Sequence, residues 1–406
     1  MGGKRVPYVL GADDNMLDPD PRVAQALTDR LRAQGHEVVT DDAGMVVWFL
    51  TTDDAEHLLT APELSAGVAM AMLHLSGVHD GPLHELWSDL MFGKDGDDHK
   101  RIRQSVARRF TPKAVGRLRP TIERISDELL SSWPPGTIVD VWESFAVPLP
   151  GRSACALVGI PDDDASHVAE WALQLVRAFG LLDPDAVDST NTAAAELVAY
   201  LDELITSGLT PNGSILHALT TDDSHGLSTG ELRGLAGNLV FGGLDGTAKA
   251  ITTGLAHLLE TPHAWTALTA DPAGAAPGAV AELLRFYPPV PGTVRLPVKP
   301  ATCRGTDLDA GQVVGVSFDA VCKDPHHVDR PDELDISRTP GKQYAFGAGP
   351  HYCLGANLAK LVLETAFRDL AARYPTLRLA QDPATAPWTQ DPFRGIIELP
   401  VHVPES

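Results

Sequence analysis

Apolar residues recur at the spacing of a helix face over much of the chain. Near the C-terminus they are Leu354, Leu358, Leu361, Val362, Ala366 and Leu370. This period of three to four residues predicts a helix that begins at about residue 354. A longer helix is expected to begin at Ser228, because Ser228 and Glu231 have the spacing of a capping box, and to end near Glu260, because Pro262 follows.

The remaining pattern predicts a mainly α-helical chain with a minor β-sheet region. The run 45–50 is rich in valine and aromatic residues and predicts a strand, and residues 53–59 are predicted to be helical. Residues 159–207 predict two helices, with an interruption at 182–189. The segment 64–92 has no clean period, so we expect a loop that contains short helical pieces.

Composition fits a large enzyme with many loops. The chain has 406 residues, of which 44% are hydrophobic, with 36 glycines and 32 prolines. No Gly/Ser-rich linker, charge block or internal repeat marks a boundary, so we expect one domain over residues 1–406.

Membrane and secretory signals are not evident in the sequence. No stretch of about 18 apolar residues occurs, and the first residues lack the apolar core of a signal peptide. Four cysteines in so long a chain do not suggest a disulfide framework. We therefore expect a cytoplasmic protein that does not bind membranes and that is a monomer.

Charge is distributed unevenly along the chain. The formal net charge of -22 opposes nucleic-acid binding, yet residues 99–119 contain eight Lys or Arg residues and no Asp or Glu. One interpretation is an ordinary solvated helix face. The other is a docking surface for an acidic electron donor.

The most informative segment surrounds Cys353. Residues 346–355 read Phe-Gly-Ala-Gly-Pro-His-Tyr-Cys-Leu-Gly, so the cysteine lies at the N-terminus of the predicted helix, where the helix dipole and free N–H groups favour a thiolate. His351 adds a donor for an anionic group. The alternatives are a small buried apolar residue or a zinc ligand, but Cys155, Cys303 and Cys322 form no closely spaced pair.

This segment resembles the haem-binding loop of the cytochrome P-450 family, the haem-thiolate monooxygenases. The resemblance implies the P-450 fold and a haem b cofactor with Cys353 as the iron ligand. Phe346 would then pack on the haem, His351 would bind a propionate, and Gly347, Gly349 and Gly355 are the fixed glycines of the loop.

A second part of the resemblance lies in the middle of the long predicted helix. Residues 242–247 read Gly-Gly-Leu-Asp-Gly-Thr, and Gly243 and Asp245 match a motif that passes over the haem. Gly246 stands where relatives carry a threonine that helps to deliver protons. Thr247 points about 100° away on a helix, so we expect water or a substrate hydroxyl to act beside Asp245.

Other matches complete the expected haem site. His99 and Arg103, four residues apart on one predicted helix, and Arg295 match positions that bind haem propionates in relatives. Glu282 and Arg285 resemble the family's Glu-x-x-Arg pair, with Arg338 as the third partner. We assign these last three residues to folding and haem retention.

The substrate pocket is assigned by position only. The residues expected to line it are Leu244, Val290, Thr293, Val294, Phe393 and Ile396. In relatives, the loops that correspond to 64–92 and to the interrupted helix pair lie over the substrate.

The resemblance therefore implies monooxygenation of a small organic molecule of secondary metabolism. Oxygen and two electrons would be used, and the electrons would come from a ferredoxin and an NAD(P)H-dependent ferredoxin reductase, because the chain carries no flavin or iron–sulfur motif. Because Gly246 replaces the usual threonine, an enzyme that is driven by peroxide, or that catalyses dehydrogenation or bond coupling, is an alternative. A non-catalytic haem-based sensor is a further alternative.

Overall fold

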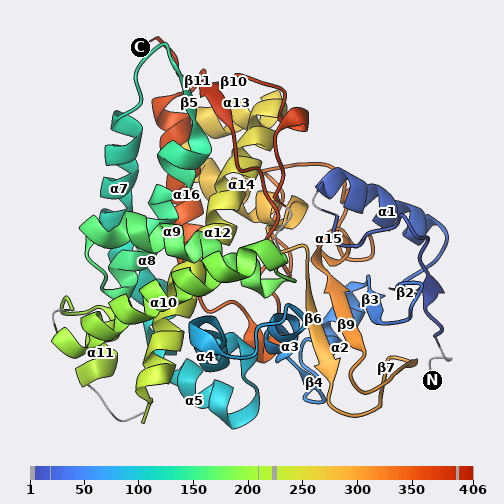
Figure 1. Ribbon diagram of the computed structural model, residues 1–406. Helices are drawn as coiled ribbons and strands as arrows, with labels where there is room; N and C mark the ends of the chain where they lie inside the picture. Colours follow the sequence, from blue (N-terminus) through green and yellow to red (C-terminus); the bar gives the residue numbers. More distant parts are fainter. Residues whose placement is uncertain (1–4, 19, 209, 222–225, 390–392, 406) are drawn as a thin grey trace.

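The computed structural model describes residues 5–18, 20–208, 210–221, 226–389 and 393–405. Helices make up the larger part, and most strands gather on the side of the N-terminal helix α1 (Figure 1). The expectation of a mainly α-helical chain with a minor sheet region is confirmed.

The α-helices are α1 Pro21–Ala33, α2 Thr52–Leu58, α3 Val68–Leu75, α4 Gly81–Asp89, α5 Gly96–Ala107, α6 Pro112–Val115, α7 Arg119–Ser131, α8 Pro148–Val158, α9 Ala165–Val176, α10 Pro184–Ser207, α11 Ile215–Thr221, α12 Thr229–Glu260, α13 Pro262–Ala270, α14 Pro272–Phe286, α15 Phe318–Val321 and α16 Ala356–Arg373.

The strands are β1 Tyr8–Val9, β2 Val38–Thr40, β3 Val46–Phe49, β4 Leu64–Ser65, β5 Ile138–Asp140, β6 Gly292–Pro297, β7 Ala301–Cys303, β8 Thr306–Leu308, β9 Val313–Ser317, β10 Arg378–Leu379 and β11 Pro400–His402. Within the described residues they form one sheet in the order β1-β2-β3-β9-β6-β4, a small sheet β10-β11-β5 and the hairpin β7-β8. In the large sheet β3 pairs in parallel with β9, and β9 pairs antiparallel with β6.

Helix α12 runs through the helical part and packs against α4, α8, α9, α14 and α16. Its buried residues lie all round the helix, which is typical of a helix enclosed on every side. One apolar cluster joins α12 to α7, α14 and α16, and a second joins it to α4, α8, α9 and α10. Residues on α12 are therefore held in fixed positions.

The predicted limits of α12 are confirmed. The Ser228 hydroxyl accepts a hydrogen bond from the Glu231 N–H (3.1 Å), and the Glu231 carboxylate accepts one from the Ser228 N–H (2.9 Å). These two bonds are the predicted capping box. The helix ends at Glu260, directly before Thr261 and Pro262.

The segment 64–92 is more regular than predicted, because it contains the complete helices α3 and α4. The Leu83 N–H of α4 donates to the Asn191 side chain of α10 (3.1 Å), and α4 packs against α10 and α12. The interruption between the next two helices is shorter than predicted, since α10 already begins at Pro184, with the Asp183 carboxylate as its N-cap. None of the described helices combines the length and apolar character needed to cross a bilayer.

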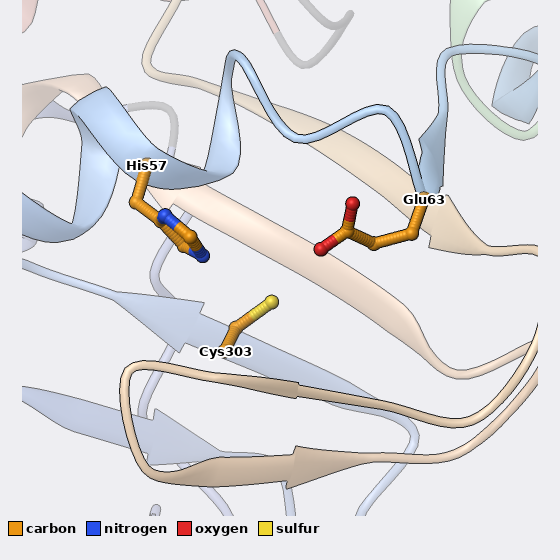
Figure 2. Close-up of side chains that lie close together, drawn as sticks. All are labelled: His57, Glu63 and Cys303. Atoms are coloured by element: carbon orange, nitrogen blue, oxygen red, sulfur yellow. The ribbon is translucent and has the colours of Figure 1, made fainter.

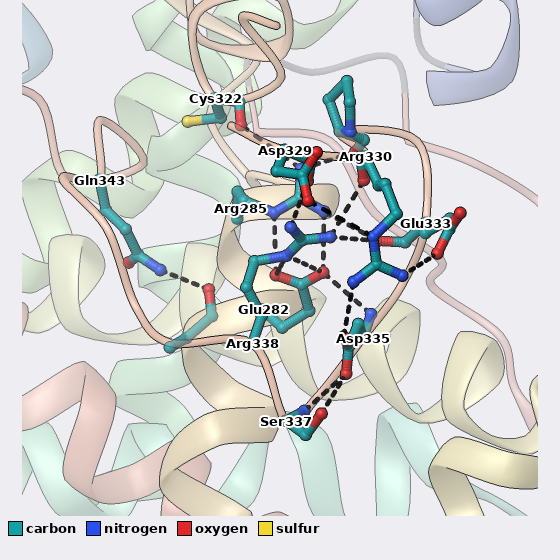
Figure 3. Close-up of polar contacts among 12 residues, drawn as sticks. Glu282, Arg285, Cys322, Asp329, Arg330, Glu333, Asp335, Ser337, Arg338 and Gln343 are labelled. Carbon is teal, nitrogen blue, oxygen red and sulfur yellow. Dashed lines mark hydrogen bonds and ion pairs between the residues drawn. The ribbon is translucent and has the colours of Figure 1, made fainter. Parts of the chain in front are cut away.

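A buried network of charges fixes the segment that follows α15. The Glu282 carboxylate accepts two hydrogen bonds from Arg285 (both 2.8 Å), a bifurcated one from the Arg338 Nε (3.1 and 3.2 Å) and one from the Asp335 N–H (3.0 Å). Figure 3 shows both arginines also reaching backbone carbonyls around Glu333. The predicted partners therefore lie together, and they tie residues 329–338 to α14.

The network sets the ionisation of its only buried carboxyl group. Burial by itself would raise the pKa of Glu282, but the hydrogen bonds from Arg285, the Asp335 N–H and Arg338 outweigh it, so that the pKa lies below its ordinary value. A carboxyl group with a lowered pKa in the folded state stabilises the fold at neutral pH, and this contribution is lost as the pH falls through the folded-state pKa.

Replacing Glu282 by glutamine is expected to lower the free energy of unfolding by about 3–5 kcal/mol at pH 7, because the buried Arg285 and the partly buried Arg338 lose their counter-charge. The difference from the wild type should shrink in acid, where the wild-type carboxylate is protonated. Equilibrium urea unfolding at several pH values measures this. The matched control is Glu333→Gln, since Glu333 makes a surface pair with Arg330 (2.6 Å) and should lose at most about 1 kcal/mol; equal losses in both variants would contradict the assignment.

Candidate active site

Cys353 lies in a tight turn directly before α16. Its N–H donates to the Phe346 carbonyl (2.9 Å), and its own carbonyl accepts from the Ala356 N–H (3.3 Å) in the first turn of the helix. The short helix Gly349–His351 precedes it. The turn fixes the backbone on both sides of the cysteine, and the Cys353 side chain faces a large internal cavity.

The ionisation of Cys353 differs from the prediction. Burial raises the pKa of the thiol, and the Gly355 N–H, the Arg103 guanidinium and the Ala356 N–H offset only part of that rise. The helix N-terminus is therefore not sufficient to produce a thiolate at neutral pH. A positive metal centre bonded to the sulfur would supply the missing stabilisation.

The cavity has a volume of about 1490 Å³. It is bounded by α12, the Cys353 turn, β6, α5 and the η6 helix (Arg177–Phe179), with Phe393 from the C-terminal segment. Of the residues predicted for the site, those that line the cavity are His99, Arg103, Gly243, Asp245, Thr247, Val290, Thr293, Val294, Arg295, His351, Cys353, Gly355 and Phe393.

Five predicted residues do not line the cavity. Leu244 is fully buried and packs toward α8 and α9, against Gly151, so the expectation that it contacts substrate is not met. Ile396 lies in the core, and its neighbour Ile397 faces the cavity instead.

Phe346, Gly347 and Gly246 are the other three. Phe346 acts through its carbonyl, which accepts from Cys353 as described above, and its ring lies beside Tyr352 and under the Lys360 ammonium. Gly347 takes a positive φ of 71° in the turn. These two residues therefore shape the turn.

Two arginines and two histidines gather at one side of the cavity, and burial lowers the pKa of both histidines, that of His99 to about 4. Arg103 and His99 come from α5, Arg295 comes from β6, and His351 comes from the cysteine turn. Arg295 donates to the Thr293 hydroxyl (3.0 Å) and the Val294 carbonyl (2.8 Å), and burial lowers its pKa. No carboxylate among the described residues forms an ion pair with it, although buried charges are normally paired.

His99 gives the clearest sign of a missing ligand. It is buried, and its Nε2 atom has no hydrogen-bond partner among the described residues. Its ring stacks on that of His351, whose Nε2 atom lies 3.2 Å from Asp95. An anionic ligand between these rings and Arg295 would satisfy both the orphaned nitrogen and the buried guanidinium. The donor set therefore fits the two carboxylates of a haem, as the resemblance implies.

A lysine that the sequence reasoning missed contacts the expected proton-delivering acid. The Lys249 ammonium lies 2.8 Å from the Asp245 carboxylate and also donates to the Phe393 carbonyl (2.8 Å). Both side chains line the cavity, yet they are only 1% and 3% exposed to solvent. The signal was present in the sequence, since residues four apart on a helix are neighbours and an acid that precedes a base by four is a favourable pair.

Packing in α12 restricts the side chain at Gly243 more than at Gly246. A Cβ atom at Gly243 would lie only 3.1 Å from the Ala154 side chain, so this glycine lets α8 approach α12 closely. At Gly246 a Cβ atom would meet Phe393 at 3.6 Å, an ordinary contact distance. A Cβ atom therefore fits at position 246 without displacing its neighbours.

Apolar side chains form much of the remaining cavity wall. Leu173, Phe179 and Leu239 are among these side chains. Asn238 also lines it, and its side-chain oxygen has no hydrogen-bond partner among the described residues. A buried acceptor of this kind is available to a ligand that carries a hydroxyl or N–H group.

Comparisons with known proteins give a consistent result. The family profile described as Cytochrome P-450 matches residues 276–393. The cytochrome P-450 monooxygenase PikC of Streptomyces venezuelae is 34% identical over 404 residues, which cover 97% of this chain and 93% of PikC. The polyketide biosynthesis cytochrome P-450 PksS of Bacillus subtilis is 33% identical over 77% of this chain and 78% of PksS.

A solved structure agrees over nearly the whole chain. The cytochrome P-450 enzyme CxnD, described as forming a C–S bond in chuangxinmycin biosynthesis, superposes with a TM-score of 0.85 at 28% identity and covers 94% of each chain. The likeness therefore extends well beyond the residues matched by the family profile.

Lys249→Met is expected to lower the free energy of unfolding by about 3–5 kcal/mol, because it removes the cation that contacts a buried carboxylate. Adding Asp245→Asn should restore much of the loss, as a double-mutant cycle in urea unfolding will measure. The control is Arg233→Met on the same helix, where Arg233 forms a partly exposed pair with Asp202 (3.3 Å) that is worth about 1 kcal/mol or less. Equal effects of the two single substitutions would show that the Asp245–Lys249 pair has no special weight.

Proposed function

This chain belongs to the cytochrome P-450 family of monooxygenases, and we propose that it oxidises a small organic molecule of secondary metabolism with O2 and two electrons from a ferredoxin and its NAD(P)H-dependent reductase. The observation that carries the proposal is that Cys353, two arginines with two histidines, and the acid Asp245 all line one cavity. Relatives such as PikC and PksS support the general class of reaction.

We assign Cys353 as the iron ligand of a haem b. His99, Arg103, Arg295 and His351 would hold its two propionates, and Gly243 and Gly355 would border it. The bound haem would supply the oxygen-activating chemistry, and the protein would set the ligand, the local electric field and the access of substrate. Within the described residues, the His99 Nε2 atom has no hydrogen-bond partner and the Arg295 guanidinium forms no ion pair, and both observations support this arrangement.

Asp245 is the proposed source of protons at the cavity. Lys249 holds its carboxylate by a direct contact of 2.8 Å, and the Thr247 hydroxyl lies on the same cavity wall. Since Gly246 presents no hydroxyl, we propose that a water molecule or a substrate hydroxyl occupies the adjoining space and carries the proton onward. Lys249 is then a positioning residue, because it acts through Asp245.

The proposed substrate is a largely apolar molecule with at least one hydrogen-bond donor. The apolar walls formed by Leu173, Phe179 and Leu239 favour apolar contact, and the free acceptor of Asn238 favours a hydroxyl or N–H group. Val290, Thr293, Val294 and Phe393 would contact it between that end and the haem.

The basic segment 99–119 is the proposed docking surface for the ferredoxin. The Arg103 guanidinium donates to the Tyr352 carbonyl (2.6 Å), and the Asn357 side chain of α16 donates to the Phe110 carbonyl (2.8 Å). The segment thus packs directly against the Cys353 turn, and Arg108, Lys113 and Arg117 lie at the surface. An acidic electron donor would be steered to this side by complementary charge.

A second candidate reaction is the coupling of two parts of a substrate, because a structurally similar enzyme is described as forming a C–S bond and Gly246 departs from the usual proton relay. Turnover with O2, ferredoxin, reductase and NADPH, compared with turnover by peroxide alone, separates an oxygen-dependent reaction from a peroxide-driven one. Product analysis then separates insertion of oxygen from bond coupling. A haem-based sensor would consume no NADPH in response to any compound.

The reduced haem-loaded protein is expected to give, with carbon monoxide, the strongly red-shifted Soret band that marks a thiolate ligand. Cys353→Ser should lose this band, because a hydroxyl does not replace a thiolate as an iron ligand. Cys155→Ser is the matched control, since Cys155 is a buried cysteine of α8 outside the site, and it should keep the band. A folded wild type without the band would refute the proposed site.

Gly246→Thr is expected to fold, because there is room for a Cβ atom, and to change the product formed per NADPH consumed. With a substrate whose own hydroxyl carries the proton, the threonine should displace that hydroxyl. The product formed per NADPH consumed should then fall about fivefold, which corresponds to the loss of one hydrogen bond of roughly 1 kcal/mol. With an analogue that lacks this hydroxyl, the ratio should rise, because the threonine supplies the group. Gly246→Ala controls for volume alone, and unchanged yield and product identity in both variants would remove any special role from the glycine.

A further inference from the structure

We propose that His57, Glu63 and Cys303 form a binding site for a zinc ion beside the turn that carries Cys353. The site is separate from the cavity, since none of the three residues lines it. Its function would be to hold together segments that pack against the Cys353 turn.

The three side chains come from three separate segments. His57 lies in the last turn of α2, Glu63 directly precedes β4, and Cys303 ends β7. Figure 2 shows the imidazole, the carboxylate and the sulfur turned toward one common space. Their ligand atoms lie within 4.8 Å of one another, and no other group of three His, Cys, Asp or Glu residues in the described part of the chain comes this close.

The separation is somewhat larger than in a closed zinc site. Bonds of about 2.0–2.3 Å in tetrahedral geometry place ligand atoms about 3.3–3.8 Å apart. Closing the site therefore requires shifts of about 1 Å, by the same geometry. His57 is exposed and free to make such a shift, whereas Cys303 is fully buried and stays in place.

The chemistry of the three groups selects zinc over the common hard cations. Calcium and magnesium prefer sets of oxygen ligands, whereas sulfur, imidazole and carboxylate together suit Zn²⁺. Three protein ligands leave a fourth position for water, and the exposed His57 marks the side from which a metal enters.

The acidic residues nearest to the site are already paired with basic side chains. The Asp54 carboxylate of α2 pairs with Arg5 and Arg304 (both 2.7 Å), and that of Glu56 pairs with Lys342. Among the described residues, the Glu63 carboxylate and the His57 imidazole form no such pair. The cluster thus keeps a free carboxylate and a free imidazole next to a sulfur.

The Cys303 thiol lies in a buried, negatively charged environment. Burial, followed by the negative charges of Glu63 and Asp54, raises the pKa of the thiol to about 11. A divalent ion between the sulfur and Glu63 would reverse the effect of these charges and displace the proton.

The position of the site connects it to Cys353. The Leu59 carbonyl, between His57 and Glu63 in the chain, packs so tightly against Gly349 that a Cβ atom there would collide with it. Gly349 has a φ of 69° and begins the short helix that leads to Cys353. The Glu63 carbonyl accepts a hydrogen bond from the Val298 N–H (3.1 Å). A metal would therefore join the segments of His57, Glu63 and Cys303, and the Leu59 carbonyl that contacts Gly349 lies between the first two.

The test uses the haem-loaded full chain in which His84 is replaced by glutamine. This removes a competing imidazole pair, because the Nε2 atoms of His74 and His84 lie 3.3 Å apart at the surface. Zinc binding is measured by competition with a chromophoric chelator. One ion per chain is expected, and His57→Gln and Cys303→Ser should each weaken binding by at least about tenfold, since even indirect partners of a metal ligand contribute 10–100-fold.

Cys155→Ser is the matched control for the loss of a buried cysteine, and it should bind zinc as the parent does. Cadmium offers an independent signature, because ¹¹³Cd bound to a thiolate resonates far downfield of ¹¹³Cd bound only to nitrogen and oxygen. That signal should be present in the parent and absent in Cys303→Ser. If Cys303→Ser fails to fold, His57→Gln, at an exposed position, still decides the question.

A second measurement concerns the Cys353 turn. Zinc should raise the temperature at which the ferrous carbon monoxide complex loses its thiolate signature in the parent, but not in His57→Gln. Absence of zinc binding, or equal affinity in the parent and both variants, would overturn the proposal. Neither readout requires turnover, so failure here leaves the proposed oxidation untouched.

Discussion

The structure depends on holding one buried sulfur at the wall of a cavity. The Cys353 thiol lies where burial opposes its ionisation, and its own helix does not compensate fully. The sulfur keeps its position at the cavity wall only if the backbone of Cys353 is held rigidly. The bond from its N–H to the Phe346 carbonyl fixes one side, and the start of α16 fixes the other.

That support continues into the surrounding fold. Helix α16 packs along α14, and α14 carries Glu282, whose carboxylate organises two guanidinium groups and the backbone of residues 329–338. The side chains of Glu282, Arg285 and Arg338 do not line the cavity, yet their network stabilises the helix against which the cysteine helix packs. Separate parts of the chain therefore converge on the same backbone turn.

Sequence reasoning identified features that are encoded locally. The capping box at Ser228, the pair of Glu282 with Arg285 and the position of Cys353 before a helix follow from residue type and spacing within a few positions. Arg338 is 56 residues from Glu282, and only the family resemblance pointed to it. Sequence reasoning failed where tertiary contacts determine the local structure or the direction of a side chain. Helices α3 and α4 have weak periodicity and owe their order to packing on neighbouring helices, and in the irregular C-terminal segment the choice between Ile396 and Ile397 depends on which residue the core accepts.

Lys249 links Asp245 on α12 to the C-terminal segment that carries Phe393. Its ammonium contacts both Asp245 and the carbonyl of Phe393, so the acid on α12 and the segment that presents Phe393 share one cation. A redesign that alters this segment to admit another compound would also disturb the carboxylate. Given the proposed role of Asp245 in proton delivery, a variant chosen for a broader range of compounds is expected to lose more of its electrons to peroxide.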